Sequence, residues 1–187
     1  MSEIDPLLQA HNLLPAQLAE LEASTGDPRV TEVKVWGSGM RDIAPGESGA
    51  IHTEGLNGCH VSIITGKDGQ GKRTLALTHF PPSYGKDGYM RSLGEISEAM
   101  KLGGVEVDGI VSVVDERRYP AETEALGEVF AGVPVSEVPY NSRDKGRAYF
   151  PGKGEVFAAI DYSQEQAALV VATEAGMQEF ALAGVSQ

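Results

Sequence analysis

The sequence contains little cysteine, little positive charge and no long apolar run. Cys59 is the only cysteine among 187 residues, so no disulfide can form within the chain, as is usual in a reducing compartment. The 15 Lys and Arg residues stand against 27 Asp and Glu, and the net charge of −12 argues against nucleic acid and anionic membranes as partners. No stretch approaches the roughly 18 apolar residues of a membrane-spanning helix, and no signal peptide is expected. These absences favour a cytoplasmic protein, although a secreted effector exported without a signal peptide would have the same composition.

Alternating and β-branched apolar residues predict a strand-rich domain. Residues 37–49, rich in glycine, are expected to form a loop, and Ser92 is expected to cap the first helix of the domain. Near the end of the chain a hairpin is preferred over a helix that would open at the capping-box sequence 163–166. Strands are expected at 29–36, 59–65, 73–80, 107–114, 133–138, 147–150, 155–160, 168–173 and 177–182, and helices at 92–102 and 122–131.

The order of these elements predicts one domain with a short appendage. Residues 1–28 contain an amphipathic segment that ends at a Gly-Asp-Pro sequence, which predicts an N-terminal helical arm. Residues 29–187 are expected to form the domain itself. Strand-rich ends around two helices predict an α+β sandwich of mixed, mostly antiparallel sheets with the two main helices on one side.

Two patterns resemble cofactor or metal sites but lack features that such sites require. Residues 66–73, GKDGQGKR, nearly match a phosphate-binding loop, but Arg73 stands where a hydroxyl should hold magnesium and a strand follows in place of a helix. This segment is therefore predicted to be a hairpin turn. The histidines at 52, 60 and 79 lack the short paired spacing of zinc ligands, and His60 should point away from its neighbour Cys59 on an extended segment. We expect no cofactor and no metal.

Cys59 and His79 are the candidate nucleophile and base. A lone thiol is often a small buried hydrophobe, but an imidazole beside it would activate it for nucleophilic attack. A turn near Gly69 lies ten residues from each, which would make them cross-strand neighbours with Cβ atoms roughly 4.5–5.5 Å apart. Thr53, six residues before the cysteine, is placed to orient the imidazole through its hydroxyl or carbonyl, as a third group does in Ser-His-Asp systems.

These residues carry a resemblance to a known family. Residues 53–59, TEGLNGC, resemble the T-x-G-L-G-S-C motif of the CheD family of chemoreceptor glutamine deamidases, and LTHF at 77–80 resembles that family's A-H-F segment. NSRDKGR at 141–147 is similar to its N-x-G-R-K loop, and the resemblance covers about residues 30–161. It implies an α/β/β sandwich, shared with the catalytic domain of cytotoxic necrotizing factor toxins, and a Cys-His-Thr triad that maps onto Cys59, His79 and Thr53.

The resemblance implies hydrolysis of a glutamine side-chain amide in a protein substrate, in chemotaxis. Backbone N–H groups near Gly58 and Cys59, with Asn57, would then bind the oxyanion. The sequence departs from the family, because Asn57 and Gly58 replace Gly-Ser, the 141–147 loop lacks a glycine, and segments before residue 30 and after 161 are additional. Two alternatives remain: a non-catalytic protein-binding module of the same fold, and a secreted deamidase or transglutaminase that acts on a host protein.

Overall fold

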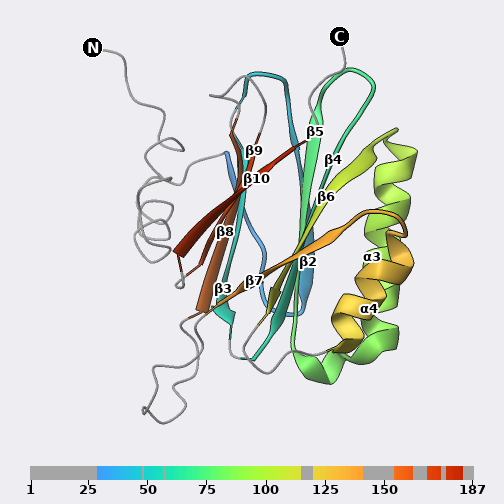
Figure 1. Ribbon diagram of the computed structural model, residues 1–187, viewed down its shortest axis with the longest axis vertical. Helices are drawn as coiled ribbons and strands as arrows, with labels where there is room; N and C mark the ends of the chain where they lie inside the picture. The colour runs from blue at the N-terminus through green and yellow to red at the C-terminus, as the bar shows by residue number, and fades with distance from the viewer. Residues whose placement is uncertain are drawn as a thin grey trace.

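Two five-stranded sheets face each other, and helices cover the outer face of one of them (Figure 1). The computed structural model describes residues 29–47, 49–56, 58–114, 120–140, 154–161, 168–173 and 176–182. The first sheet has the order β1-β3-β8-β9-β10, formed by β1 (Val30–Glu32), β3 (Gly49–Leu56), β8 (Gly154–Asp161), β9 (Ala168–Thr173) and β10 (Gly176–Ala181). The second has the order β2-β5-β4-β6-β7, formed by β2 (Gly37–Ile43), β4 (His60–Lys67), β5 (Arg73–Phe80), β6 (Glu106–Val114) and β7 (Val135–Pro139).

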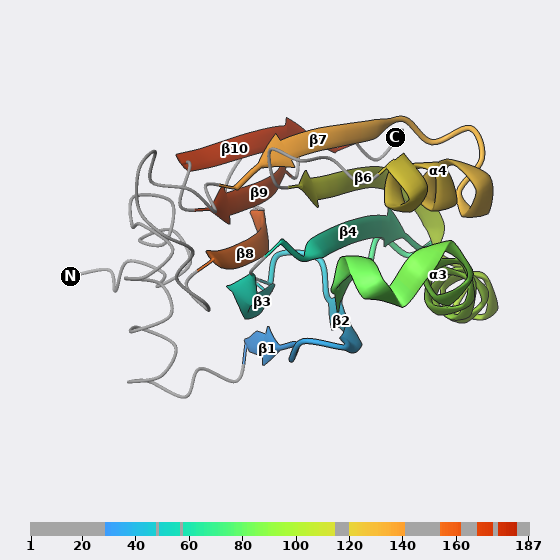
Figure 2. The same cartoon turned by 90° about the horizontal axis from the view of Figure 1, so that it is seen from below.

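The helices α3 (Gly85–Leu102) and α4 (Pro120–Val129) lie side by side against the second sheet, as the view from below in Figure 2 shows. A short 3₁₀ helix, η1 (Pro82–Tyr84), joins β5 to α3. Most strand pairs are antiparallel, and the parallel ones are β1 with β3 and β6 with β7. The predicted α+β sandwich with two helices on one side is thus confirmed. None of the helices in the described ranges is long and apolar enough to span a membrane.

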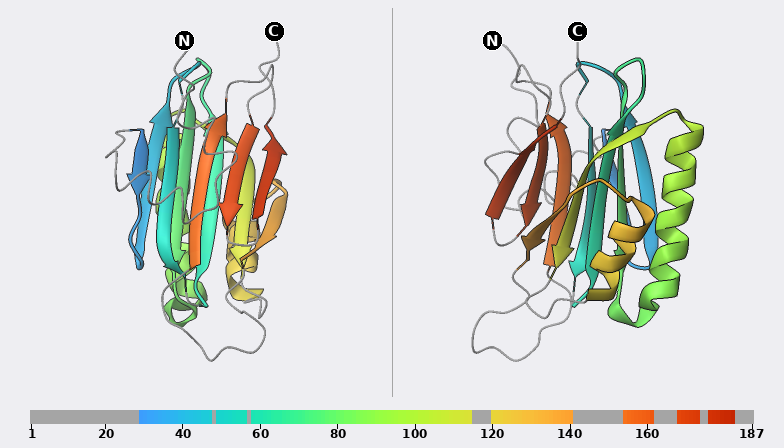
Figure 3. Two further views of the ribbon diagram at one scale, coloured as in Figure 1. Left: turned by 90° about the vertical axis from the view of Figure 1, so that its left-hand side faces the viewer. Right: turned by 45° about the vertical axis from the view of Figure 1, so that its right-hand side comes forward.

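Two apolar clusters hold these layers together. The first fills the space between the sheets, where Ile51 of β3 and Val156 of β8 pack with Val61 of β4 and Leu77 of β5. The second lies between the second sheet and the helices and includes Ile64 and the α3 residue Tyr89. The central strand β4 is buried on both faces because it contributes alternate side chains to the two clusters, which explains its nearly continuous β-branched sequence. The layers are visible from two sides in Figure 3.

The glycine-rich segment predicted to be a loop contains strand β2. Gly37–Ile43 pairs antiparallel with residues 73–79 of β5 at one edge of the second sheet. Glycine is required there by close packing rather than by a turn, since a Cβ on Gly39 would lie 2.7 Å from Cγ2 of Val33. The prediction of a strand over 29–36 was correct only for Val30–Glu32. The chain then crosses from the first sheet to the second through residues 33–36.

Helix α3 begins seven residues before the expected cap. Ser92 is buried inside the helix, because Tyr89 extends the apolar stripe of Leu93, Ile96 and Met100 by one turn toward the N-terminus. The hairpin predicted at the end of the chain is confirmed by the antiparallel pairing of β9 with β10. The predicted arm at 1–28, the strand at 147–150 and the loop at 141–147 lie outside the described residues.

The near match to a phosphate-binding loop is a hairpin turn, as predicted. The side-chain Oδ1 of Asp68 accepts hydrogen bonds of 2.9 Å from the backbone N–H groups of Gln70 and Lys72. Arg73 then begins β5, and its guanidinium is buried in an ion pair of 2.8 Å with Asp108. This turn presents no helix N-terminus, and the guanidinium of Arg73 is already paired in the protein interior.

Candidate active site

His79 lies near the end of β5, with its side chain in the interior between the two sheets. Gly37 of β2 and Val61 of β4 are its partners on the two neighbouring strands. The imidazole is completely buried. The strands on both sides thus fix the position of this ring in the sheet.

Thr53 approaches His79 from β3 of the opposite sheet. Its Oγ1 lies 2.6 Å from Nδ1 of His79 and 2.6 Å from the backbone oxygen of Val33. A carbonyl oxygen only accepts, so the single hydroxyl hydrogen of Thr53 must be donated to Val33. The hydroxyl therefore accepts from Nδ1–H of His79. This pair of contacts selects one tautomer of the imidazole and leaves the lone pair on Nε2.

Nε2 of His79 is available as a proton acceptor. It is buried, and it has no hydrogen-bond partner within the part of the chain that the structure describes. Burial lowers the pKa of His79 from 6.5 to about 4, because the interior disfavours the charged imidazolium. The ring is therefore neutral near pH 7, which is the state a general base requires.

Cys59 stands next to the first residue of β4, diagonally across from His79. Val61 is the residue directly opposite His79, and the alternation of side chains along the strand places Cys59, two residues earlier, on the same face. The prediction of a direct Cys59–His79 pair was thus wrong by two residues, because the turn is centred one residue later than Gly69. A shift of two preserves the face, and such diagonal neighbours lie about 7–8 Å apart between Cα atoms. Cys59 forms no disulfide and has 6% of its surface exposed.

The backbone around Cys59 is held by contacts that the sequence did not reveal. The buried hydroxyl of Tyr140 donates a hydrogen bond of 2.8 Å to the backbone oxygen of Cys59, across 81 positions of the chain. Gly58, just before the cysteine, has a φ of 72°, a left-handed conformation that glycine adopts without strain. Asn57, the other residue predicted to serve an oxyanion site, lies outside the described residues. The contacts from Val33 and Tyr140 were missed because no local pattern encodes them.

His60 belongs to the other face of β4, as predicted. Its Nε2 lies 2.7 Å from Oγ of Ser112, and its ring packs edge-on against Tyr89 with centroids 5.4 Å apart. Burial lowers the pKa of His60 to about 3. His60 is therefore a neutral core residue on the helix side of the sheet, and no group of three or more possible metal ligands occurs among the described residues.

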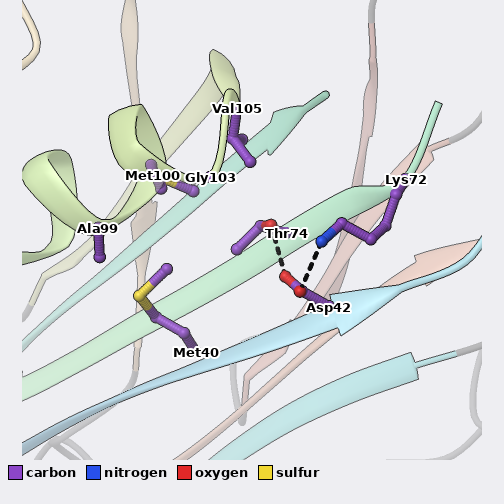
Figure 4. Close-up of a pocket in the computed structure, with 8 residues that line it drawn as sticks. All are labelled: Met40, Asp42, Lys72, Thr74, Ala99, Met100, Gly103 and Val105. Carbon is purple, nitrogen blue, oxygen red and sulfur yellow. Dashed lines mark hydrogen bonds and ion pairs between the residues drawn. The ribbon is translucent and has the colours of Figure 1, made fainter. Parts of the chain in front are cut away.

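A cavity at the other end of β5 contains neither a cysteine nor a histidine. It has a volume of about 360 Å³ and lies between the β2–β5 edge and the C-terminal end of α3 (Figure 4). Asp42 accepts hydrogen bonds of 2.7 Å from Lys72 and Thr74, and the bond from Lys72 lowers the pKa of Asp42 most. Because these polar groups satisfy one another and no cysteine or histidine lines the cavity, the candidate site is the one formed by Thr53, His79 and Cys59.

The contribution of the Thr53 hydroxyl can be measured directly. Thr53→Val keeps the shape of the side chain and leaves Nδ1–H of His79 and the oxygen of Val33 without their buried partner. We expect the free energy of unfolding to fall by about 3 kcal/mol, the sum for two unsatisfied buried groups. Thr53→Ser retains the hydroxyl and should lose only about 1 kcal/mol, for the methyl group. Urea unfolding measures both. Nitrogen chemical shifts of His79 should also show the Nε2–H tautomer in Thr53→Val, and equal effects of the two variants would contradict the assignment.

Comparison with known proteins finds a distant structural likeness. No protein-family model and no curated protein sequence matches the chain. Among solved structures, it is similar to the crystal structure of the C-terminal domain of CNFy from Yersinia pseudotuberculosis, with a TM-score of 0.40 and 10% sequence identity. The match covers 82% of this chain and 61% of that chain. At this level of similarity no conclusion about activity follows from the match.

Proposed function

We propose that this protein is a cysteine-dependent amidohydrolase that converts the side-chain amide of a glutamine in a protein substrate to glutamate. Cys59 is the nucleophile, His79 the base and Thr53 the residue that positions the base. The hydrogen bond from His79 to Thr53 carries the proposal, because it directs the lone pair of Nε2 away from Thr53 and leaves it free to act on a thiol. The resemblance of residues 53–59 to the CheD motif supports glutamine as the amide.

The first half of the reaction forms a thioester and releases ammonia. Nε2 of His79 takes the proton of the Cys59 thiol, and the sulfur attacks the carbon of the amide. Backbone N–H groups at Gly58 and Cys59, with Asn57, bind the oxyanion that develops; one such donor is typically worth about 3 kcal/mol. The imidazolium then gives its proton to the departing NH₂ group. Since Thr53 accepts from Nδ1–H throughout, the same nitrogen, Nε2, receives and returns the proton.

The second half regenerates the thiol. Water attacks the thioester carbon while Nε2 of His79 removes one of its protons, and the C–S bond breaks. The sulfur recovers the proton from the imidazolium, so one amide and one water become one carboxylic acid and one ammonia. A primary amine in place of water would give an amide cross-link by the same steps. The product therefore distinguishes deamidation from transglutamination.

Product analysis with a cysteine variant tests this proposal. Wild-type protein and Cys59→Ala are incubated with purified cytoplasmic domains of chemoreceptors, the substrate class that the motif suggests, with and without monodansylcadaverine. We expect ammonia release and conversion of defined glutamines to glutamate by mass spectrometry with the wild type alone. Equal conversion by Cys59→Ala would refute the role of the thiol. No conversion, together with alkylation of Cys59 by iodoacetamide at the rate of an ordinary thiol, would instead identify a non-catalytic binding module.

A further inference from the structure

Tyr140 follows the last residue of β7, and its side chain lies between the two sheets. It is completely buried and belongs to the same apolar cluster as Val61, the residue opposite His79 on β4. Its backbone N–H donates a hydrogen bond of 3.1 Å to the backbone oxygen of Val114, at the end of β6. The phenol is therefore held on the face of the second sheet that carries His79.

The strand register brings Tyr140 and Cys59 to the same end of that face. One row of paired residues crosses the sheet from β5 through β4 and β6 to β7, and it consists of His79, Val61, Val113 and Val138. Cys59 lies two residues before this row, and Tyr140 lies two residues after it. Because β4 and β7 run in opposite directions, both shifts lead to the same end of the sheet. An even number of residues also keeps both side chains on one face.

The hydroxyl of Tyr140 acts on the backbone of the cysteine. It donates a hydrogen bond of 2.8 Å to the backbone oxygen of Cys59. Strand β4 begins at His60, so this bond holds the carbonyl of a residue that precedes the strand and follows the left-handed Gly58. The direction of that carbonyl fixes the rotation about the Cα–C bond of Cys59. Through the Cα atom, it also fixes where the sulfur stands relative to Nε2 of His79.

A second buried tyrosine provides a comparison within the same domain. The hydroxyl of Tyr89 donates a hydrogen bond of 3.0 Å to the backbone oxygen of Phe80 and lies 3.5 Å from that of His60. Its ring is also completely buried, but it belongs to the cluster between the second sheet and the helices. Removal of either hydroxyl takes a donor from a buried carbonyl. Of the two hydroxyls, that of Tyr140 bonds to Cys59 itself.

We propose that Tyr140 is a positioning residue that aligns the sulfur of Cys59 with Nε2 of His79. This inference rests on the proposed amidohydrolase function and adds the group that sets the geometry of its nucleophile. Diagonal neighbours on a sheet stand farther apart than direct partners, so the approach of the sulfur to the imidazole depends on the backbone of Cys59. A small displacement of a reacting group has a large kinetic effect. Tyr140 acts through this backbone and takes no part in the proton transfer.

Alkylation of Cys59 by iodoacetamide tests the alignment without a protein substrate. Cys59 is the single cysteine, so the rate reports this thiol alone. The rate is measured from pH 6 to pH 9 in the wild type, Tyr140→Phe and Tyr89→Phe. We expect Tyr140→Phe to react about tenfold more slowly at pH 7, with the half-maximal rate reached about one pH unit higher, because a displaced sulfur loses the help of the imidazole. Tyr89→Phe should stay within about twofold of the wild type, although both variants should lower the urea midpoint similarly.

His79→Asn, which lacks the base, separates failure of this inference from failure of the proposed function. We expect it to slow alkylation at least as much as Tyr140→Phe does. If His79→Asn slows the reaction and Tyr140→Phe matches the wild type, the positioning role is overturned and the proposed function stands. Equal slowing by Tyr89→Phe and Tyr140→Phe would also overturn it, because general loosening of the core would then explain both. A wild-type rate equal to that of an ordinary thiol, unchanged in His79→Asn, would reject the proposed function and this inference with it.

Discussion

Replacing His79 with asparagine is expected to lower kcat/KM for amide hydrolysis at least about a thousandfold. The asparagine NH₂ group can still donate to Thr53 in place of Nδ1–H, so the cross-sheet hydrogen bond is kept and only the base at Nε2 is lost. A positioned general base contributes roughly 10²- to 10⁴-fold, and here the same group must also protonate the leaving ammonia. Ammonia release under saturating and subsaturating substrate measures the loss, and circular dichroism confirms the fold.

His60→Gln is the matched control for that variant. His60 is buried on the same strand pair but on the opposite face of β4, and a glutamine can retain the bond that Nε2 makes to Ser112. We expect the kcat/KM of this variant to stay within about threefold of the wild type, because the side chain at position 60 does not contact the reacting residues. Comparable losses in the two variants would mean that His79 acts through core packing and not as a base.

The free energy of unfolding is expected to fall by about 4 kcal/mol between pH 7 and pH 5. Burial lowers the pKa of His60 to about 3 and of His79 to about 4, whereas both titrate near 6.5 in the unfolded chain. Below pH 6.5 the unfolded state therefore binds protons that the folded state does not, and stability decreases as the pH falls toward the folded-state values. At pH 5 the difference amounts to about 2 kcal/mol for each histidine.

Urea unfolding at pH 7, 6 and 5 measures this loss. The His60→Gln and His79→Asn variants should each show a loss about 2 kcal/mol smaller than the wild type over this interval, because one titrating group is gone. The double variant should retain only the weaker dependence that comes from carboxylates. If the free energy of unfolding depends on pH equally in the wild type and the double variant, burial of neutral histidines is not the cause of that dependence.

Local sequence signals predicted the β4–β5 hairpin well and its register less well. β-branched residues before the 68–72 turn and an apolar run after it are sufficient to identify two paired strands. The residue at which pairing begins depends on how Asp68 closes the turn with its side chain, which no hydrophobic pattern records. The error was an even number of residues, so the inference that Cys59 and His79 share a face did not depend on it.

Two elements were misread for a common reason. Glycines in Gly37–Ile43 suggested a loop, and glycines at positions 85 and 88 hid the first two turns of α3. In both cases tertiary packing outweighs local propensity. Pairing with β5 stabilises β2, and the burial of Tyr89 stabilises the first turns of α3. Gly39 and Gly88 permit close approach of neighbouring side chains, whereas Gly85 has a positive φ of 70°.

The amino-acid sequence alone determined the α+β class, the paired strands around residue 70 and the candidates Cys59, His79 and Thr53, because spacing and composition act over short distances along the chain. Only the tertiary structure decided which imidazole nitrogen is protonated, since that depends on Thr53 and Val33 from elements far from His79 in sequence. It also decided that Trp36 stands exposed, with its ring against Tyr84. A side chain's neighbours across a sandwich follow from sheet order and crossover path, which are set by the packing of the whole domain.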